Sequence, residues 1–176
     1  MKIGLCGTMS VGKTTLVNAL KKLPEFKNYK FATERSKYLN DLGIPLNTDS
    51  TLKGQTVFLA ERCAELMNNS IITDRTVLDV MAFTMNAKSI GHQDKDIFEN
   101  YAKEFIREYD YIFYISPYGL PIENNGVRET DEHYRDLIDF TITTLIKRYS
   151  YMANSIEKIS GSTDERIQQI LNITGL

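Results

Sequence analysis

This chain of 176 residues has few cysteines, no long apolar run and no surplus of basic charge, so it lacks the features that mark disulfide-linked, membrane-spanning and nucleic-acid-binding proteins. Its two cysteines, Cys6 and Cys63, lie in apolar, periodic stretches, so we expect buried thiols rather than a disulfide or a metal pair. No apolar run approaches the ~20 residues that a membrane-spanning helix needs. The net charge of −2 carries no basic surplus that would indicate duplex nucleic acid or an anionic membrane as a partner.

Internal repeats, low-complexity tracts and linkers are also missing from the sequence. The length is that of one domain with its own core, so we expect a single domain over residues 1–176. The first apolar stretch follows Met1 and Lys2 directly, so we expect no signal peptide and a cytoplasmic location. The oligomeric state stays open, with a homodimer among the alternatives.

Residues 7–14 match the pattern G-x-x-x-x-G-K-[ST] of the phosphate-binding P-loop. A short apolar stretch at 2–6 precedes the motif, and a helical pattern that Pro24 ends follows it. The glycines let the backbone wrap a phosphate chain, and the N–H groups of the loop and of the helix start then face the anion. The residues that we expect to bind the nucleotide are Gly7, Thr8, Met9, Ser10, Val11, Gly12, Lys13, Thr14 and Thr15.

Two side chains of this loop carry specific roles in the prediction. Lys13 is placed to reach the β- and γ-phosphates of ATP, and the Thr14 hydroxyl is placed to ligate Mg²⁺. The alternative is a glycine-rich turn that binds nothing.

Short β-branched or aromatic stretches alternate with helical patterns along the rest of the chain. We expect strands at 2–6, 29–33, 70–73, 111–115 and 155–159, and helices at 15–23, 36–42, 50–69, 77–88, 94–109, 131–149 and from 162 onward. Thr130 is the expected N-cap of the helix at 131–149, and Ser162 with Glu165 forms a capping box. This alternation predicts a three-layer α/β fold: a five-stranded parallel sheet flanked by helices, with a lid at about 117–135.

The helix expected at 50–69 has two faces of interest. Its core stripe is predicted to be Leu52, Thr56, Leu59, Cys63 and Leu66, with Gln55, Phe58 and Arg62 on a neighbouring face. Gln55 and Phe58 could line an acceptor pocket, because ring stacking and amide hydrogen bonds suit a nucleobase. Core packing of Phe58 and exposure of Gln55 are the alternative.

Charged residues follow the second and third expected strands, where the carboxyl ends of parallel strands meet at one ligand-binding edge. Glu34 and Arg35 follow the second strand, and Asp74 and Arg75 follow the third. We predict that Glu34 or Asp74 is the general base, that Asp74 also serves the metal, and that Arg35 and Arg75 bind substrate. Helix capping by Asp74 and surface ion pairs for the arginines are the alternatives.

The lid and the last turn complete the predicted site. Arg128 is assigned a catalytic role in neutralising the transferred phosphoryl group, and Arg135 a role in binding substrate. Gly161, after the last strand, is expected to contact the nucleotide.

Together these segments resemble a small P-loop kinase family, the single-domain AAA-type NTPase and kinase group related to the nicotinamide-riboside kinase domain. The resemblance rests on the P-loop and on short segments listed here in chain order: 33–39, Lys53-Gly54-Gln55, 72–83, 126–135 and Gly161 with Glu165-Arg166. It implies a P-loop kinase fold, ATP with Mg²⁺ as donor and a nucleoside-like acceptor. Asp74-Arg75 is also similar to the Asp-Arg motif of thymidylate kinases, but Thr76 and Asp79 stand where that pattern has an aromatic residue and a serine.

The leading hypothesis is therefore an ATP- and Mg²⁺-dependent phosphotransferase that moves the γ-phosphate to a small nucleoside or nucleotide. A regulatory NTPase without acceptor chemistry is one alternative, since the P-loop alone would satisfy it. A kinase that acts on a polynucleotide end or a modified base is another, which the acidic charge balance disfavours.

Overall fold

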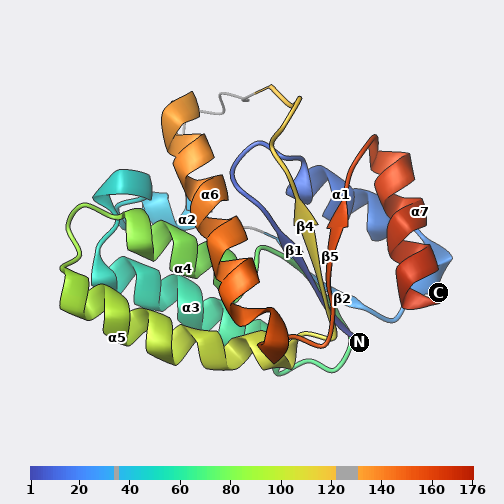
Figure 1. The fold of residues 1–176 in the computed structure, drawn as a ribbon. Helices are drawn as coiled ribbons and strands as arrows, with labels where there is room; N and C mark the ends of the chain where they lie inside the picture. Colours follow the sequence, from blue (N-terminus) through green and yellow to red (C-terminus); the bar gives the residue numbers. More distant parts are fainter. Residues whose placement is uncertain (34–35, 122–130) are drawn as a thin grey trace.

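The computed structural model describes residues 1–33, 36–121 and 131–176, and these form an α/β fold around one parallel sheet (Figure 1). The strand order is β2-β3-β1-β4-β5, and every neighbouring pair is parallel, which confirms the predicted five-stranded sheet. The strands are β1 (Lys2–Cys6), β2 (Lys30–Ala32), β3 (Ile71–Asp74), β4 (Tyr111–Ile115) and β5 (Ile156–Ile159). β1 lies at the centre, so the P-loop that follows it emerges between β3 and β4.

Helices cover both faces of this sheet, as the predicted three layers require (Figure 1). α1 (Lys13–Leu20) and α7 (Thr163–Thr174) lie on one face. The opposite face carries α3 (Leu52–Leu66), α4 (Val77–Asn86), α5 (His92–Ala102) and α6 (Glu132–Tyr149). The remaining helices are α2 (Ser36–Asp41) and the 3₁₀ turns η1 (Pro24–Phe26), η2 (Asn47–Asp49), η3 (Lys103–Glu108) and η4 (Ser150–Met152).

Each layer of helices closes a separate apolar core against the sheet. One core joins Leu5 and Phe113 of the strands to Leu16 of α1, and the other joins Ile112 to Met81 of α4. With both faces covered, β1 and β4 are buried along nearly their whole length, as is usual for a parallel sheet. No helix in the described part of the chain is long and apolar enough to cross a membrane.

Several element boundaries differ from the prediction, and two of them are informative. The helix expected at 94–109 is present but shorter: α5 ends at Ala102 and the 3₁₀ turn η3 follows. Residues three apart lie on one side of a 3₁₀ turn, and this brings both Ile106 and Tyr109 into the core. The N-cap of α6 is Asp131, which accepts a hydrogen bond from the His133 N–H, so the assignment of this cap to Thr130 is wrong.

The buried face of α3 was predicted only in part. Leu59 and Leu66 are buried as expected, but Thr56 is exposed. Gln55 and Arg62 are buried in its place, at positions that share a helical face with Leu59 and Leu66. The apolar pattern could not show this, because the two polar side chains face a pocket and the end of β3 rather than apolar core.

Candidate active site

The P-loop forms a tight cradle between β1 and α1. Gly7 (φ 151°), Ser10 (φ 58°) and Gly12 (φ 82°) all take positive φ angles. A Cβ atom at Gly7 would meet the carbonyl oxygen of Ile115 in β4, so only glycine fits there. The loop borders a hollow, about 260 Å³ counted with its open mouth, that Lys13, Thr14, Asp74 and Arg75 also line. The structure thus brings the motif and the end of β3 together at one hollow, and the role of this hollow as a nucleotide site stays a prediction.

Lys13 is buried and turned back over its own loop. Its Nζ donates to the carbonyl oxygen of Gly7 (2.5 Å) and to that of Thr8 (2.7 Å). Burial lowers the pKa of Lys13, and the nearby Asp79 carboxylate opposes that shift. The ammonium is therefore held at the floor of the cradle, where a bound polyphosphate would offer it stronger acceptors than two carbonyl groups.

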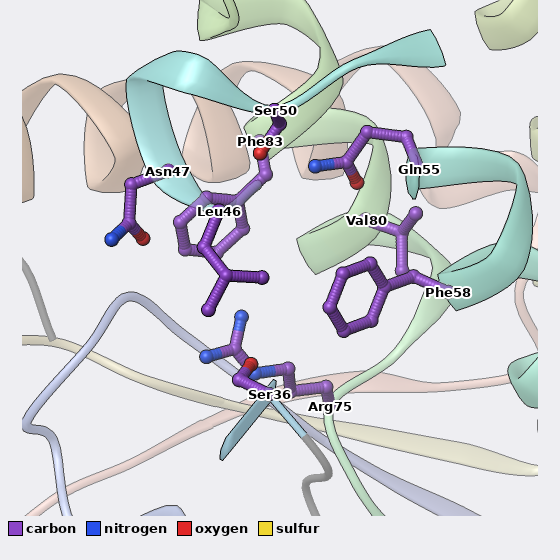
Figure 2. Close-up of a pocket in the computed structure, with 9 residues that line it drawn as sticks. All are labelled: Ser36, Leu46, Asn47, Ser50, Gln55, Phe58, Arg75, Val80 and Phe83. Carbon is purple, nitrogen blue, oxygen red and sulfur yellow. The ribbon is translucent and has the colours of Figure 1, made fainter. Parts of the chain in front are cut away.

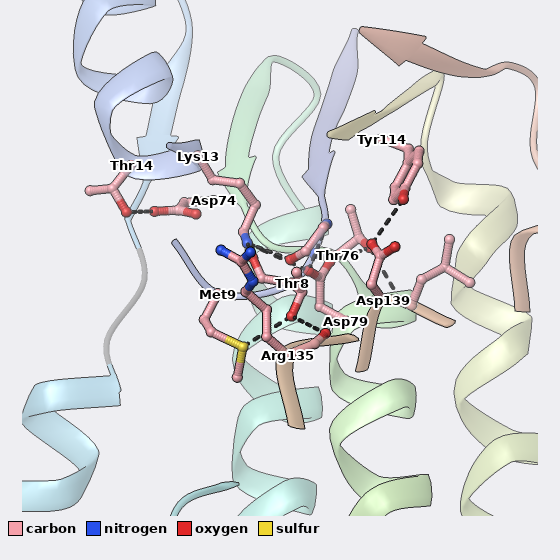
Figure 3. Close-up of polar contacts among 12 residues, drawn as sticks. Thr8, Met9, Lys13, Thr14, Asp74, Thr76, Asp79, Tyr114, Arg135 and Asp139 are labelled. Carbon is pink, nitrogen blue, oxygen red and sulfur yellow. Dashed lines mark hydrogen bonds and ion pairs between the residues drawn. The ribbon is translucent and has the colours of Figure 1, made fainter. Parts of the chain in front are cut away.

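Asp79 is the residue of this site that the sequence prediction missed. Its fully buried carboxylate accepts hydrogen bonds from the Gly7 N–H (3.1 Å), the Thr76 N–H (2.7 Å) and the Thr76 hydroxyl (2.8 Å), and it lies 4.0 Å from the Lys13 Nζ (Figure 3). Asp79 thus joins the start of α4 to the start of the P-loop. The signal was available, because Thr76-x-x-Asp79 has the spacing of a capping box.

Thr14 and Asp74 lie together at the other side of the cradle (Figure 3). The Thr14 hydroxyl donates to one Asp74 carboxylate oxygen at 2.5 Å. The other oxygen, Oδ1, is buried and has no hydrogen-bond partner among the described residues. A hydroxyl beside a carboxylate with an unsatisfied oxygen is a donor set that fits Mg²⁺. Helix capping does not explain Asp74, because Thr76 caps α4.

No group of three or more histidine, cysteine or acidic residues that could hold a metal occurs in the described ranges. A Mg²⁺ site can do with fewer protein ligands, because the ion usually keeps waters and takes substrate phosphate oxygens.

A second hollow of about 340 Å³, counted with its open mouth, lies on the α3–α4 side (Figure 2). Phe58 and Gln55 of α3 and Phe83 of α4 line it, and Figure 2 shows the Gln55 amide directed inward. Gln55 is only 3% exposed, and no hydrogen bond to its amide is found in the described part of the chain. The buried Ser50 Oγ at the same wall also lacks a partner there. Exposure of Gln55, the alternative left open by the sequence, is therefore wrong.

Arg75 lines both hollows. Its guanidinium carbon lies 4.9 Å from the centre of the Phe83 ring, and its backbone N–H donates to the Leu5 carbonyl. The residue takes φ 103°, a left-handed conformation that is uncommon for a side chain with a Cβ atom. Such strain persists only where surrounding contacts impose it, and it gathers at ligand sites. Arg75 is thus the physical link between the P-loop hollow and the aromatic pocket.

The remaining predicted residues are placed as follows. Arg135 is buried in α6, where its backbone carbonyl accepts from the Thr8 hydroxyl and its Nη1 donates to the Leu120 carbonyl. Gly161 takes φ 95° in the exposed turn that leads into α7. Glu34, Arg35 and Arg128, and residues 122–130 of the proposed lid, lie outside the described residues.

This arrangement defines a P-loop protein with a nucleoside kinase-like fold. A family model described as an AAA domain matches residues 2–166, and the chain belongs to that family. No curated protein matches the sequence significantly.

Among solved structures, deoxyadenosine kinase from M. mycoides, in complex with the products dCMP and dCDP, has a TM-score of 0.67 and 19% identity over 99% of both chains. NadR in complex with NR has a TM-score of 0.76 and 15% identity, and NadR in complex with NAD and AMP-PNP has a TM-score of 0.72 and 14% identity. The match covers 99% of this chain in each case but only 52% and 49% of the NadR chains. At these identities the likeness establishes the fold alone.

Proposed function

We propose that this protein is an ATP- and Mg²⁺-dependent phosphotransferase that moves the γ-phosphate to a small nucleoside or nucleotide. The observation that carries the proposal is the pair of hollows joined at Arg75: a P-loop cradle, and a pocket with aromatic walls that the buried Gln55 side chain also lines. A regulatory NTPase would need the first hollow but not the second. Deoxyadenosine kinase, solved with dCMP and dCDP, and NadR, solved with NR, add support from proteins of the same fold.

In this proposal each half of the site has its own task. The P-loop N–H groups and Lys13 bind the β- and γ-phosphates, while Thr14 and Asp74 hold Mg²⁺. When bound, the metal neutralises charge on the phosphate oxygens. Gln55 would hydrogen-bond the edge of the acceptor base, with Phe58 and Phe83 against its ring.

Arg75 lies between these halves, where its positive charge would stabilise the phosphoryl group as it moves toward the acceptor hydroxyl. Glu34 or Asp74 takes the proton from that hydroxyl, and Arg128 and Arg135 add positive charge from the lid segment. These roles and the single-domain organisation remain predictions, and the oligomeric state stays open.

A panel of nucleosides, nucleoside monophosphates and nicotinamide riboside, incubated with γ-labelled ATP and Mg²⁺, tests the proposal. We expect transfer to at least one acceptor, together with loss of transfer when EDTA removes the metal. Absence of transfer to every acceptor from protein that binds ATP would contradict the proposal and favour the regulatory NTPase. A short oligonucleotide in the same panel covers the polynucleotide alternative.

A further inference from the structure

The apex of the P-loop takes a shape that it does not favour on its own. Ser10, which carries a side chain, takes φ 58°, and Gly12 takes φ 82°, with Val11 between them. A left-handed residue with a Cβ atom costs on the order of 1 kcal/mol relative to its usual conformation. The loop therefore depends on contacts from neighbouring elements to keep its N–H groups aimed at the cradle.

One of these contacts comes from the opposite end of the sequence. Arg166, in α7, is 6% exposed, and its Nη1 donates to the Val11 carbonyl at 2.8 Å. The same nitrogen lies 3.3 Å from the position that a Cβ atom on Gly12 would take. The guanidinium therefore packs directly behind the apex of the loop.

The position of Arg166 is itself well determined. The preceding turn of α7 begins with a capping box in which Ser162 and Glu165 bond reciprocally to each other's backbone N–H groups. No carboxylate in the described part of the chain pairs with Arg166, and its buried Nε has no acceptor there. The charged guanidinium of Arg166 is thus placed against the P-loop and does not take part in an ion pair with a described carboxylate.

On the other side of the sheet, Asp79 accepts from the Gly7 N–H. The P-loop is therefore held at its first residue from α4 and at its apex from α7.

We infer that Arg166 is a positioning residue that braces the P-loop around the phosphate chain of the donor. This inference rests on the ATP-binding half of the proposed function. It assigns Arg166 to the phosphates, through Val11, and not to the nucleobase that the neighbouring Gly161 turn is predicted to contact. Removal of Arg166 should then weaken binding of any polyphosphate, whether or not a base is attached.

The test compares binding of Mg·ATP and of Mg·tripolyphosphate to the full chain by isothermal titration calorimetry. For Arg166→Ala we expect affinity to fall by about tenfold or more for both ligands, as the loss of a charge-assisted hydrogen bond implies. Arg166→Lys keeps a charged donor and should recover part of the loss for both ligands alike. Asn172→Ala, an exposed substitution on the same helix, should bind both ligands as the unaltered protein does.

Two results would overturn the inference. A loss of affinity confined to ATP would show that Arg166 acts on the base instead. Unchanged affinity for both ligands would show that the contact between Arg166 and Val11 does not support phosphate binding. If circular dichroism finds Arg166→Ala unfolded, Arg166→Met, which also removes the charged donor, replaces it, and the same two outcomes apply. Failure of the unaltered protein to bind ATP would instead contradict the proposed function.

Discussion

Replacing Asp79 with alanine should destabilise the fold far more than loss of an ordinary helix cap. The carboxylate is fully buried, accepts three hydrogen bonds and lies 4.0 Å from the buried Lys13 ammonium. Alanine would leave the Gly7 and Thr76 N–H groups without this acceptor and Lys13 without its nearest described carboxylate. Breaking a buried charge pair from one side typically costs about 3–5 kcal/mol, and we expect the free energy of unfolding to fall by about that amount.

Urea denaturation without nucleotide, followed by circular dichroism, measures this change. The matched control is Glu165→Ala, which removes the same capping-box position from α7, where the carboxylate is exposed. Its effect should be a small fraction of the Asp79 effect. A loss below about 1 kcal/mol for Asp79→Ala, or equal losses for both variants, would refute the reasoning, because burial would then contribute nothing beyond the cap.

The same contact predicts a shift in the pH dependence of ATP binding. Burial lowers the pKa of Lys13, and the charge of Asp79 raises it. In Asp79→Asn the opposing charge is gone, so Lys13 should lose its proton at a lower pH than in the unaltered protein. ATP affinity, measured by calorimetry across the alkaline range, should therefore begin to fall at a lower pH in the variant than in the unaltered protein. Superimposable pH profiles would contradict the effect of Asp79 on Lys13.

Three further predictions test other parts of the molecule. Gln55→Leu should raise the KM for a nucleoside acceptor about tenfold or more, because the acceptor loses its hydrogen bonds to the amide, and the KM for ATP should not change. The control Thr56→Val, at the exposed neighbouring position, should leave both KM values unchanged. Equal effects of Gln55→Leu on the two substrates would count against a base-binding role. Gly12→Ala should abolish ATP binding in steady-state titrations, because alanine resists φ 82° and its Cβ would press on Arg166; retained affinity would show that the loop tolerates another shape. Burial raises the pKa of Asp139, so the ionised carboxylate lowers the stability of the fold above its folded-state pKa, and this loss disappears as pH falls through that pKa. Asp139→Asn should therefore raise the melting temperature most at about pH 7 and less toward about pH 4. A gain in melting temperature that is constant with pH would contradict the raised pKa.

The sequence was informative where local chemistry alone determines structure. The P-loop pattern, the apolar strands and the charged residues at the end of β3 can all be recognised from residue order, and the structure places Lys13, Thr14, Asp74 and Arg75 around one hollow. The capping box at Ser162 and Glu165 was likewise readable, because its two partners are three residues apart. Their roles in catalysis are not tested by this geometry and stay predictions.

The sequence was less informative where a polar side chain is buried by contacts distant in the chain. Arg62 looks like a surface residue of α3, yet its Nη1 donates to the carbonyl oxygen of Asp74. Arg166 reaches Val11 across 155 positions of sequence, and nothing in its own helix indicates that partner. Helical periodicity indicates which positions of a helix face inward. It cannot show whether the side chain at such a position meets apolar core or a hydrogen-bond acceptor from a distant part of the chain.

The segment from Asp74 to Asp79 shows why the two halves of the site are difficult to separate. Asp74 faces Thr14, Arg75 lines both hollows, and Asp79 holds Gly7 beside Lys13. A displacement at the end of β3 would therefore disturb the metal donors, the link to the aromatic pocket and the start of the P-loop together. The strained φ of Arg75 is consistent with this, since a backbone bound at both ends has little freedom to relax. Substitutions at the acceptor pocket that leave this segment unmoved, such as Gln55→Leu, are the ones that can alter acceptor binding alone.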